Sequence, residues 1–478
     1  MRSRINKTVL LIVVAAALVV GCKKWDDHNA VTDANLTKNL MEQISENTAL
    51  SKFAELLTKT GYDKVIASSK TFTVFAPTNT ALTSLAAGIL NDTAKLRQFV
   101  GNHIATQSLF TNAAITKQRI AMLNGKYNNL LAKNIGDAAI TTSDQATKNG
   151  VLQVIDKMLP VYDNTWETLK NNTTIPASQK NYMLSLFRKI FDGQNAVQVG
   201  VNPVTGLPVY QPGTDSVQTN LFWRNVYDVR QEQNEYSLFI LTDDAWSTEV
   251  EKFKPFFATG TTDSTTELSS WSVVKDFAVD TVYTAATLPD TIISKFGVKV
   301  PLDKAAIVQT IKTSNGNIFV LGKADVKPID KLKQFYIEAE NYRVTSADRR
   351  GNTYFRDRFS PVANKDFRDV LVFNHGLALF NINYRISNVY STKYKAYWVA
   401  VNDFQTAAFT QKLGIGIPTS ATLPYTSVTA NNFNEVYIGE FTISSYQSFL
   451  DIYLTAANSG TAAVNPIVCD YIRLVPVL

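Results

Sequence analysis

Aromatic and polar side chains occur together in the last third of the chain. This cluster consists of Tyr394, Tyr397, Trp398, Asn402 and Asp403. A flat ring can stack on the apolar face of a sugar, while nearby amides and carboxylates pair with the sugar hydroxyls. Binding sites that combine an apolar surface with a few convergent polar groups are typical for small ligands. The residue types therefore indicate a candidate sugar site.

The same aromatic side chains have an alternative role in a hydrophobic core. Tyr397 and Trp398 are neighbours on one predicted strand, so their side chains point to opposite faces. Only one of them belongs to the core if a single face of the sheet is buried. We take Trp398 as the first candidate for a sugar platform. Tyr425, in a loop rich in Pro, Thr and Ser, is the second.

Cys22 follows a segment with the pattern of a secretory signal. Val9 to Val20 form an unbroken apolar run of twelve residues. The run is shorter than the ~20 residues that a membrane-spanning helix requires. The basic residues that precede the run are Arg2, Arg4 and Lys7. A cationic start followed by a short apolar stretch predicts a signal peptide, here residues 1–21.

The end of this segment, Val19-Val20-Gly21-Cys22, resembles the bacterial lipobox, whose cysteine becomes the acylated N-terminus. An ordinary signal peptide cut nearby is the alternative. Lipidation of Cys22 would leave Cys469 without a partner, so no intrachain disulfide is expected. Asp26 and Asp27, in the predicted tether of residues 22–34, resemble the export tether of surface lipoproteins in the Bacteroidota. This resemblance implies an outer-membrane lipid anchor with the protein facing the exterior; a charged spacer is the alternative.

Length and composition bound the remaining possibilities. The chain has 478 residues, of which 45% are hydrophobic and 18% are charged. At ~150 residues per domain, the part after the signal corresponds to about three domains. The formal charge is +6, and loss of the three basic signal residues leaves 6 − 3 = +3. This charge is too small to suggest a nucleic-acid partner.

Two pairs of segments indicate an internal repeat. Phe72 to Leu82 reads as a buried strand, a break and a helix start, and Tyr236 to Trp246 repeats this pattern 164 positions later. A tight turn and a strand at Asn149 to Asp156 recur at Asn315 to Leu321, 166 positions later. Two pairs at nearly the same offset predict a duplicated domain.

Thr71 to Leu82 and Asn149 to Pro160 resemble the two signature segments of the fasciclin-like domain, in the right order. Residues 35–160 form the first predicted domain of this kind. Residues 166–330 form a divergent second one, with an insertion from Asn195 to Thr219. The resemblance implies small β-sandwiches packed with helices, in a family of mostly extracellular adhesion and binding modules.

His103 lies on the apolar face of a predicted helix, Lys95 to Ile104, in the first domain. Leu96, Phe99 and Val100 share this face at helical spacing. No cysteine or acidic pair at metal-ligand spacing accompanies the histidine. We therefore expect a core residue rather than a ligand.

From Lys331 the pattern changes to short strands, one of them expected over Val370 to Ile386, which predicts an all-β sandwich for residues 331–478. Its two ends, Ile337 to Tyr342 and Cys469 to Leu474, resemble family 6 and family 35 carbohydrate-binding modules, which have a galactose-binding-like jelly-roll fold. The resemblance implies a structural Ca²⁺ held by Glu338, Glu340 and Asp470. Solvated carboxylates on an edge strand are the alternative.

Together these features predict an α+β chain with two tandem fasciclin-like domains followed by the sandwich. We expect a non-catalytic cell-surface lipoprotein for adhesion or glycan binding, with a glycan or a surface protein as partner. One alternative is a structural subunit of an outer-membrane glycan-uptake or adhesion complex. The other is a glycoside hydrolase or its accessory. No segment marks the opposed carboxylates of a glycosidase, and the G-x-S-x-G motif is absent.

Overall fold

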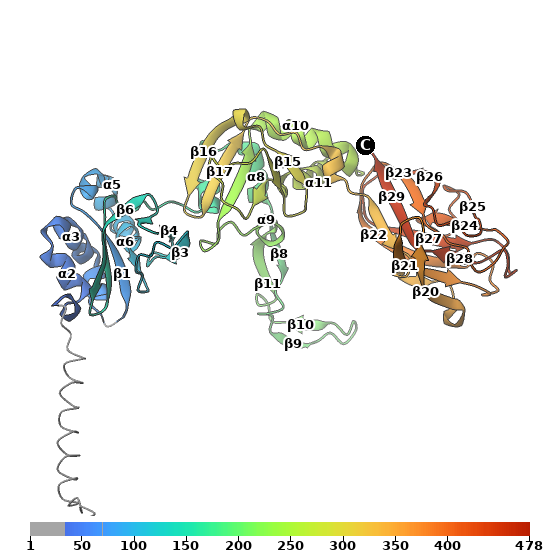
Figure 1. Ribbon diagram of the computed structural model, residues 1–478, viewed down its shortest axis with the longest axis horizontal. Coiled ribbons are helices and arrows are strands. Elements are labelled where there is room, and N and C mark those ends of the chain that lie inside the picture. Colours follow the sequence, from blue (N-terminus) through green and yellow to red (C-terminus); the bar gives the residue numbers. More distant parts are fainter. Residues whose placement is uncertain (1–33, 69) are drawn as a thin grey trace, which may run out of the picture. The chain divides into compact units, whose positions relative to one another are not determined.

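The computed structural model describes residues 34–68 and 70–478, so Cys22 and the predicted signal peptide lie outside the described residues. The chain divides into two compact units. The first contains the described residues up to Thr168 with Val229–Glu235 and Lys312–Gly316. The second contains Leu169–Asp228, Tyr236–Ile311 and Asn317–Leu478. The fold is α+β, as predicted: helices pack on sheets in the earlier part, and an all-β sandwich follows (Figure 1).

The first unit is built on a seven-stranded sheet with the order β2-β1-β7-β6-β5-β4-β3. The strands are β1 (Phe72–Pro77), β2 (Ile104–Ala105), β3 (Gln118–Ala121), β4 (Tyr127–Leu131), β5 (Asn134–Ile135), β6 (Ala138–Thr147) and β7 (Gly150–Ile155). Strands β1 and β7 are parallel neighbours. Every residue of β1 is buried, which requires that both faces of the sheet be covered there.

Helices cover one face of this sheet (Figure 1). They are α2 (Leu40–Glu46), α3 (Ser51–Thr60), α4 (Tyr62–Ile66), α5 (Ala87–Leu90) and α6 (Thr93–Gly101). Asn39 and Glu42 form a reciprocal capping box at the start of α2. Asp92 caps α6 by accepting from the amides of Ala94 and Lys95. These local signals begin the helices, and burial of their apolar faces holds them on the sheet.

The second fasciclin-like part repeats the central strand order as β13-β12-β17-β16, which confirms the predicted duplication. Its strands are β12 (Tyr236–Leu241), β13 (Ala278–Val279), β16 (Ile307–Thr313) and β17 (Gly316–Leu321), with a separate hairpin of β14 (Thr291–Ile293) and β15 (Lys299–Pro301). Its helices are α7 (Thr165–Asn171), α8 (Ala177–Ser185), α9 (Leu221–Asn225), α10 (Asp243–Phe253), α11 (Thr262–Val274) and α12 (Pro328–Lys331).

The asparagine of each Asn-Gly turn makes the same bonds in both copies. Asn149 accepts from the amide of Leu40 at 2.9 Å and donates to two backbone carbonyls. Asn315 accepts from the amide of Thr165 at 2.8 Å and also donates to two backbone carbonyls. The following Gly150 has a φ of +158°, and a Cβ there would lie 2.0 Å from the carbonyl oxygen of Phe72. The repeated motif is therefore a structural requirement of the sheet.

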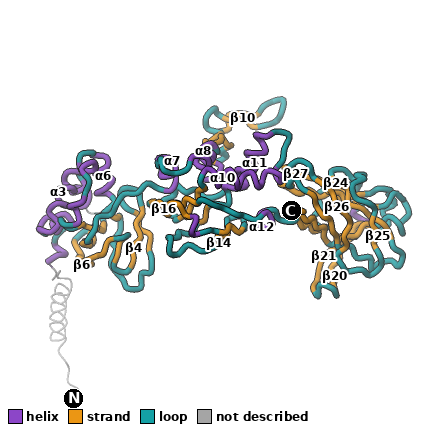
Figure 2. Tube along the Cα trace, turned by 90° about the horizontal axis from the view of Figure 1, so that it is seen from above, coloured by secondary structure: helices purple, strands orange, loops and turns teal. Residues whose placement is uncertain are grey.

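The predicted insertion forms an arm of two hairpins that projects from the second fasciclin-like part (Figures 1 and 2). Strand β8 (Phe187–Phe191) pairs with β11 (Ser216–Asn220), and β9 (Gln198–Val201) pairs with β10 (Pro208–Tyr210). No charged residue occurs between Gly193 and Thr214. The arm carries exposed aliphatic side chains, namely Val197, Val199, Val201, Val204, Leu207, Val209 and Val217.

The last part of the chain is the predicted all-β sandwich. A four-stranded sheet has the order β18-β29-β23-β26, a five-stranded sheet has the order β19-β22-β27-β24-β25, and β20-β21-β28 form a third. The strands are β18 (Phe335–Glu338), β19 (Val344–Thr345), β20 (Thr353–Ser360), β21 (Lys365–Val372), β22 (Asn381–Val389), β23 (Lys393–Trp398), β24 (Phe409–Ile415), β25 (Thr426–Val428), β26 (Val436–Thr442), β27 (Gln447–Ala456), β28 (Ile467–Cys469) and β29 (Tyr471–Val477).

One strand prediction is wrong: the range Val370 to Ile386 contains parts of β21 and β22, not one strand. Asn374 and Gly376, both with positive φ, lie in the segment that separates them. Cys469 is a free, buried cysteine on β28. None of the helices within residues 34–68 and 70–478 is long and apolar enough to cross a membrane.

Candidate functional site

Four side chains form a row across the outer face of the four-stranded sheet of the sandwich. Tyr336 on β18 is paired with Arg473 on β29. Arg473 is paired with Tyr397 on β23, and Tyr397 with Tyr437 on β26. We call these four residues the tyrosine row. Adjacent strands lie about 4.8 Å apart, so the row extends over roughly 14 Å.

Strand alternation places the row on the solvent side. The neighbours Ile337, Trp398 and Ile438 point inward and are buried in the core. Tyr336 retains 53% exposure and Tyr437 retains 51%, whereas Tyr397 between them is half-buried. The two exposed rings and the ring of Tyr397 therefore offer an aromatic surface on a rigid sheet.

Arg473 is held firmly within the row. Its guanidinium carbon lies 4.6 Å from the centre of the Tyr397 ring, a cation–π contact. Two nitrogens of Arg473 bind the Glu435 carboxylate: Nε donates to Oε1 at 2.7 Å, and Nη2 donates to Oε2. The third nitrogen, Nη1, donates to Oε1 of Gln334 at 3.2 Å. The hydrogen bond with Arg473 lowers the pKa of Glu435, so this carboxylate stays ionised and the pair stays formed.

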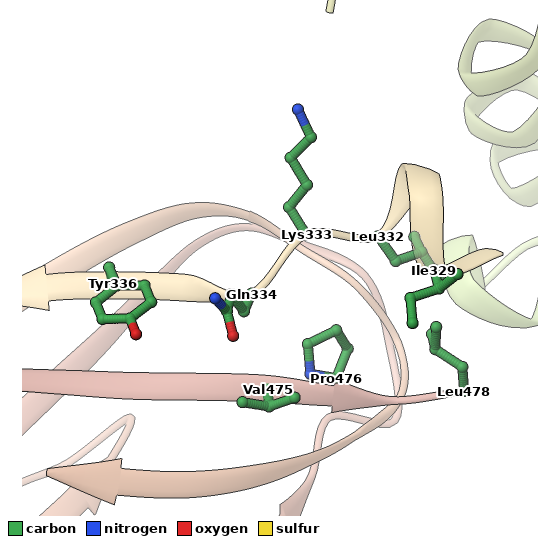
Figure 3. A pocket seen from close by; sticks show the side chains of 8 residues that line it. All are labelled: Ile329, Leu332, Lys333, Gln334, Tyr336, Val475, Pro476 and Leu478. Atoms are coloured by element: carbon green, nitrogen blue, oxygen red, sulfur yellow. The ribbon is translucent and has the colours of Figure 1, made fainter. Parts of the chain in front are cut away.

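A pocket with a volume of about 520 Å³ lies at the Tyr336 end of the row (Figure 3). Its apolar lining consists of Ile329, Leu332, Val475, Pro476 and Leu478, and its polar lining of Lys333, Gln334 and Tyr336. Figure 3 shows that the Lys333 side chain points away from the others, and its Nζ donates to the carbonyl of Phe296 at 2.9 Å. Gln334 and Tyr336 belong both to the pocket and to the surroundings of the row, so the two features are continuous.

Burial contradicts Trp398 and Tyr394 as sugar platforms. Trp398 is 1% exposed and Tyr394 is fully buried, and both belong to the sandwich core. The Tyr394 hydroxyl is used internally, because it accepts from the amide of Tyr390 at 3.0 Å and donates to the carbonyl of the same residue. Asn402 is also fully buried and donates to the carbonyl of Ala407 at 3.1 Å. These three residues cannot contact a ligand at the surface.

Tyr425 is partly exposed but belongs to a different part of the sandwich. It precedes β25 of the five-stranded sheet, and its hydroxyl donates to the carbonyl of Ala456 at 3.1 Å. Asp403 forms ion pairs with Arg356 and Arg358. Of the candidates from the sequence, the structure therefore places only Tyr397 in the row.

Sequence reasoning missed Tyr336, Tyr437 and Arg473. Tyr336 lies between Phe335 and Ile337, so alternation alone could have indicated that it faces outward. The alignment of the three residues with Tyr397 depends on strand register, and register between distant strands has no signal in a single sequence.

The carboxylates predicted to bind calcium lie close enough together to repel one another. The amide of Ala339 donates to the carbonyl of Asp470 at 2.7 Å, which joins the first and last parts of the sandwich. Burial, and then repulsion from Glu338, Asp369 and Glu340, raises the pKa of Asp470 to about 7. One oxygen of Glu340 is buried without a hydrogen-bond partner.

Within the described part of the chain, however, no three acidic, histidine or cysteine side chains are arranged to hold a metal ion. Asp369, which repels Asp470, forms an ion pair with Arg356. The carboxylates as they stand do not form a three-ligand group, and the structural Ca²⁺ at Glu338, Glu340 and Asp470 stays a prediction.

The core assignment of His103 is confirmed. The residue is fully buried, its Nδ1 lies 2.9 Å from the carbonyl of Phe99, and its Nε2 accepts from the amide of Leu159 at 2.9 Å. Its ring also packs on Phe53 and Phe99. Burial lowers its pKa to about 4, so the neutral ring connects α6 with the segment after β7.

Comparison with known proteins identifies one part of the chain. Residues 48–161 match the Fasciclin domain family, so the chain contains a fasciclin domain. No curated protein matches the chain significantly. A solved FAS1 domain pair from the insect cell adhesion molecule Fasciclin I is 17% identical, with coverage of 60% of this chain and 99% of that one and a TM-score of 0.24.

Two solved carbohydrate-binding modules match the sandwich region. A family 35 module from Clostridium thermocellum is 14% identical, and the match has a TM-score of 0.23. The match covers 30% of this chain and 99% of the module. The module CBM36, solved in complex with calcium and xylotriose, is 15% identical, with coverage of 30% and 99% and a TM-score of 0.21.

Proposed function

We propose that the chain is a non-catalytic glycan-binding protein and that the tyrosine row is its sugar platform. The observation that carries the proposal is the alignment of three tyrosines and one arginine across four strands on a solvent-facing surface. A sugar chain lying along the row would stack its apolar ring faces on the tyrosines. The length of the row, roughly 14 Å from the strand spacing, favours an oligosaccharide over a single sugar.

The electrostatics of the row support binding rather than hydrolysis. The Glu435 carboxylate is already engaged by Arg473 and by the Tyr471 hydroxyl, which donates to it at 3.0 Å. A glycosidase requires two carboxylates on opposite sides of the scissile bond, one of which donates a proton. Glu435 cannot take that role, because its lowered pKa keeps it ionised.

We further propose that lipid on Cys22 anchors the protein to the outer membrane, facing the exterior. The basic start, the short apolar run and the Val19-Val20-Gly21-Cys22 segment support this anchor. Display outside the cell would give the platform access to polysaccharide. Several acyl chains would hold the protein firmly, because each buried methylene contributes about 0.8 kcal/mol.

Adhesion to a surface protein is the second candidate function. It is favoured by the arm, whose exposed valines and lack of charge between Gly193 and Thr214 are typical of a surface that docks on protein. In that case the protein would act as a structural subunit of a surface complex.

Binding of the purified protein to a panel of polysaccharides, measured by isothermal titration calorimetry, tests the platform. Tyr397→Ala combined with Tyr437→Ala removes two stacking rings. We expect an affinity loss of at least about tenfold, which corresponds to roughly 1.4 kcal/mol. Tyr354→Ala is the matched control, since Tyr354 is an equally exposed tyrosine on β20.

A double variant that binds every glycan as tightly as the wild type would refute the platform. Release of reducing sugar would restore the enzyme alternative. Absence of binding to any glycan, together with loss of a surface partner when the arm is deleted, would favour the adhesion candidate.

A further inference from the structure

The pocket beside Tyr336 differs from the tyrosine row in its chemistry. Five of its eight lining residues are aliphatic or proline. Ile329 is 72% exposed and Leu478 is 51% exposed, so both present apolar surface to whatever enters. Lys333 is engaged elsewhere, by the carbonyl of Phe296. Among the side chains, this leaves the Gln334 amide and the Tyr336 hydroxyl as the polar groups of the lining, both on the side that faces the row.

An unsubstituted sugar would be poorly matched to this pocket. Sugar hydroxyls that enter an apolar site lose their water, and each group left without a partner weakens binding. An apolar group gains from the same burial, by about 0.8 kcal/mol for each methylene-sized unit. The lining therefore selects an apolar substituent over a hydroxyl-bearing ring.

The position of the pocket relates it to the row. Gln334 holds Arg473 through its Oε1, and Tyr336 is the end member of the row. A sugar chain stacked on Tyr336 would bring its side substituents to the pocket mouth. The adjoining Ile329, Leu332 and Leu478 gather at the far end of the pocket in Figure 3.

From this continuity we propose that the protein recognises ester-decorated glycans, with the sugar backbone on the tyrosine row and an acetyl or aromatic acyl group in the pocket lined by Ile329, Leu332, Pro476 and Leu478. This inference rests on the proposed function of the row and names the substrate class of that site. The shared chemistry is an apolar group attached through an ester.

The test compares esterified polysaccharides with the same materials after mild alkaline saponification. Acetylated xylan and feruloylated arabinoxylan are the two probes, and they distinguish acetyl from aromatic acyl groups. We expect the wild-type protein to bind the acetylated form roughly fourfold more tightly than its saponified form, the value for one buried methyl-sized group. The effect should be larger for the feruloyl ester, because its ring buries more surface.

Ile329→Asn combined with Leu478→Asn should remove this preference while leaving binding of the saponified polysaccharide unchanged. Both side chains are exposed, so the variant should fold. Val308→Asn is the matched control, since Val308 is an exposed aliphatic residue on β16. It should keep the full preference.

The possible failures are distinguishable. Equal affinity for esterified and saponified forms, with binding still dependent on Tyr397 and Tyr437, would refute the ester pocket and leave the platform intact. A preference that survives the double asparagine variant would place the ester elsewhere. No binding to either form would refute both proposals. Concentration-dependent dimers that the double variant abolishes would instead put a second copy of the chain in the pocket.

Discussion

Acidification should destabilise the first fasciclin domain through His103. The folded protein holds the pKa of this ring at about 4, against 6.5 for the ordinary group, because burial opposes its charge. In addition, Nε2 already accepts a hydrogen bond from the amide of Leu159, so a proton on that nitrogen would face a donor. Between these two pH values the unfolded chain binds more protons than the folded one. The free energy of unfolding must therefore fall as the pH drops from 6.5 towards 4.

The size of this effect follows from the difference between the pKa values. A difference of about 2.5 corresponds to roughly 3 kcal/mol, since one pKa unit is worth about 1.4 kcal/mol. This is a large fraction of the stability of a typical domain. Global melting would not isolate it, because burial also lowers the pKa of His375 in the sandwich. Hydrogen–deuterium exchange of peptides spanning residues 93–109 and 150–161 reports the first domain alone.

His103→Phe is the matched variant. Phe277 is the equivalent residue in the second copy of the repeat. The carbonyl of Phe277 accepts from the amide of Phe239, just as the carbonyl of His103 accepts from the amide of Phe75. The variant keeps a ring but leaves the Leu159 amide without an acceptor, which should cost about 1–3 kcal/mol at pH 8.

Below pH 6.5, local stability should fall less steeply in His103→Phe than in the wild-type protein. The measured quantity is the hydrogen-exchange protection factor, corrected for intrinsic exchange. Between pH 6.5 and pH 4 it should drop by roughly a hundredfold more in the wild-type protein than in the variant. Parallel pH dependence of the two proteins would refute the assignment of a buried neutral histidine.

Three further predictions concern other regions. Cys22→Ser should prevent acylation and release the protein from membranes; a variant that stays membrane-bound after a high-salt wash would contradict the anchor. Asn149→Ala should lower the stability of the first domain by roughly 2–3 kcal/mol, because the buried partners of Asn149 lose their hydrogen bonds, and Asn315→Ala should do the same for the second domain. Hydrogen exchange should show each loss in its own domain, and equal losses in both domains from one variant would argue against separate roles. Asp470 has a folded pKa of about 7, above its ordinary 3.8, so the folded state holds its proton longer and wild-type stability should decline as the pH rises from about 4 to 7. Asp470→Asn should therefore melt at a higher temperature than the wild type at pH 8 in EDTA, and an equal or lower melting temperature of the variant would refute this reasoning. A marked rise of the wild-type melting temperature on addition of calcium would support the predicted calcium site.

The duplicated architecture could be predicted from the sequence because its signals are local. The strand from Phe72 and its copy from Tyr236 are continuous apolar runs, and such runs mark buried central strands. The Asn-Gly turns at Asn149 and Asn315 recur because a side chain at either glycine position would collide with the neighbouring backbone or strain the turn. Burial of His103 was also predicted, from helical spacing, but the predicted helix extends too far: α6 ends at Gly101, and His103 lies in the turn before β2.

The tyrosine row, our proposed sugar platform, could not be predicted in the same way. Alternation established that Tyr397 and Trp398 face opposite sides, but it did not determine which side is the core. The tertiary structure buries Trp398 among the side chains between the sheets and leaves Tyr397 outside. The larger ring was the wrong choice, because the sandwich gains more by burying it.

The sequence by itself determined the order of the domains, the repeat and the segments that begin each sheet, since these depend on neighbouring residues. Only the tertiary structure decided the site. Tyr336, Tyr397, Tyr437 and Arg473 come from strands up to 137 positions apart, and pairing across four strands aligns them. The predicted calcium ligands are a related case, because pairing of β18 with β29 is what brings Glu338 near Asp470. Register and side-chain direction arise from packing of the whole sandwich, and no single segment encodes them.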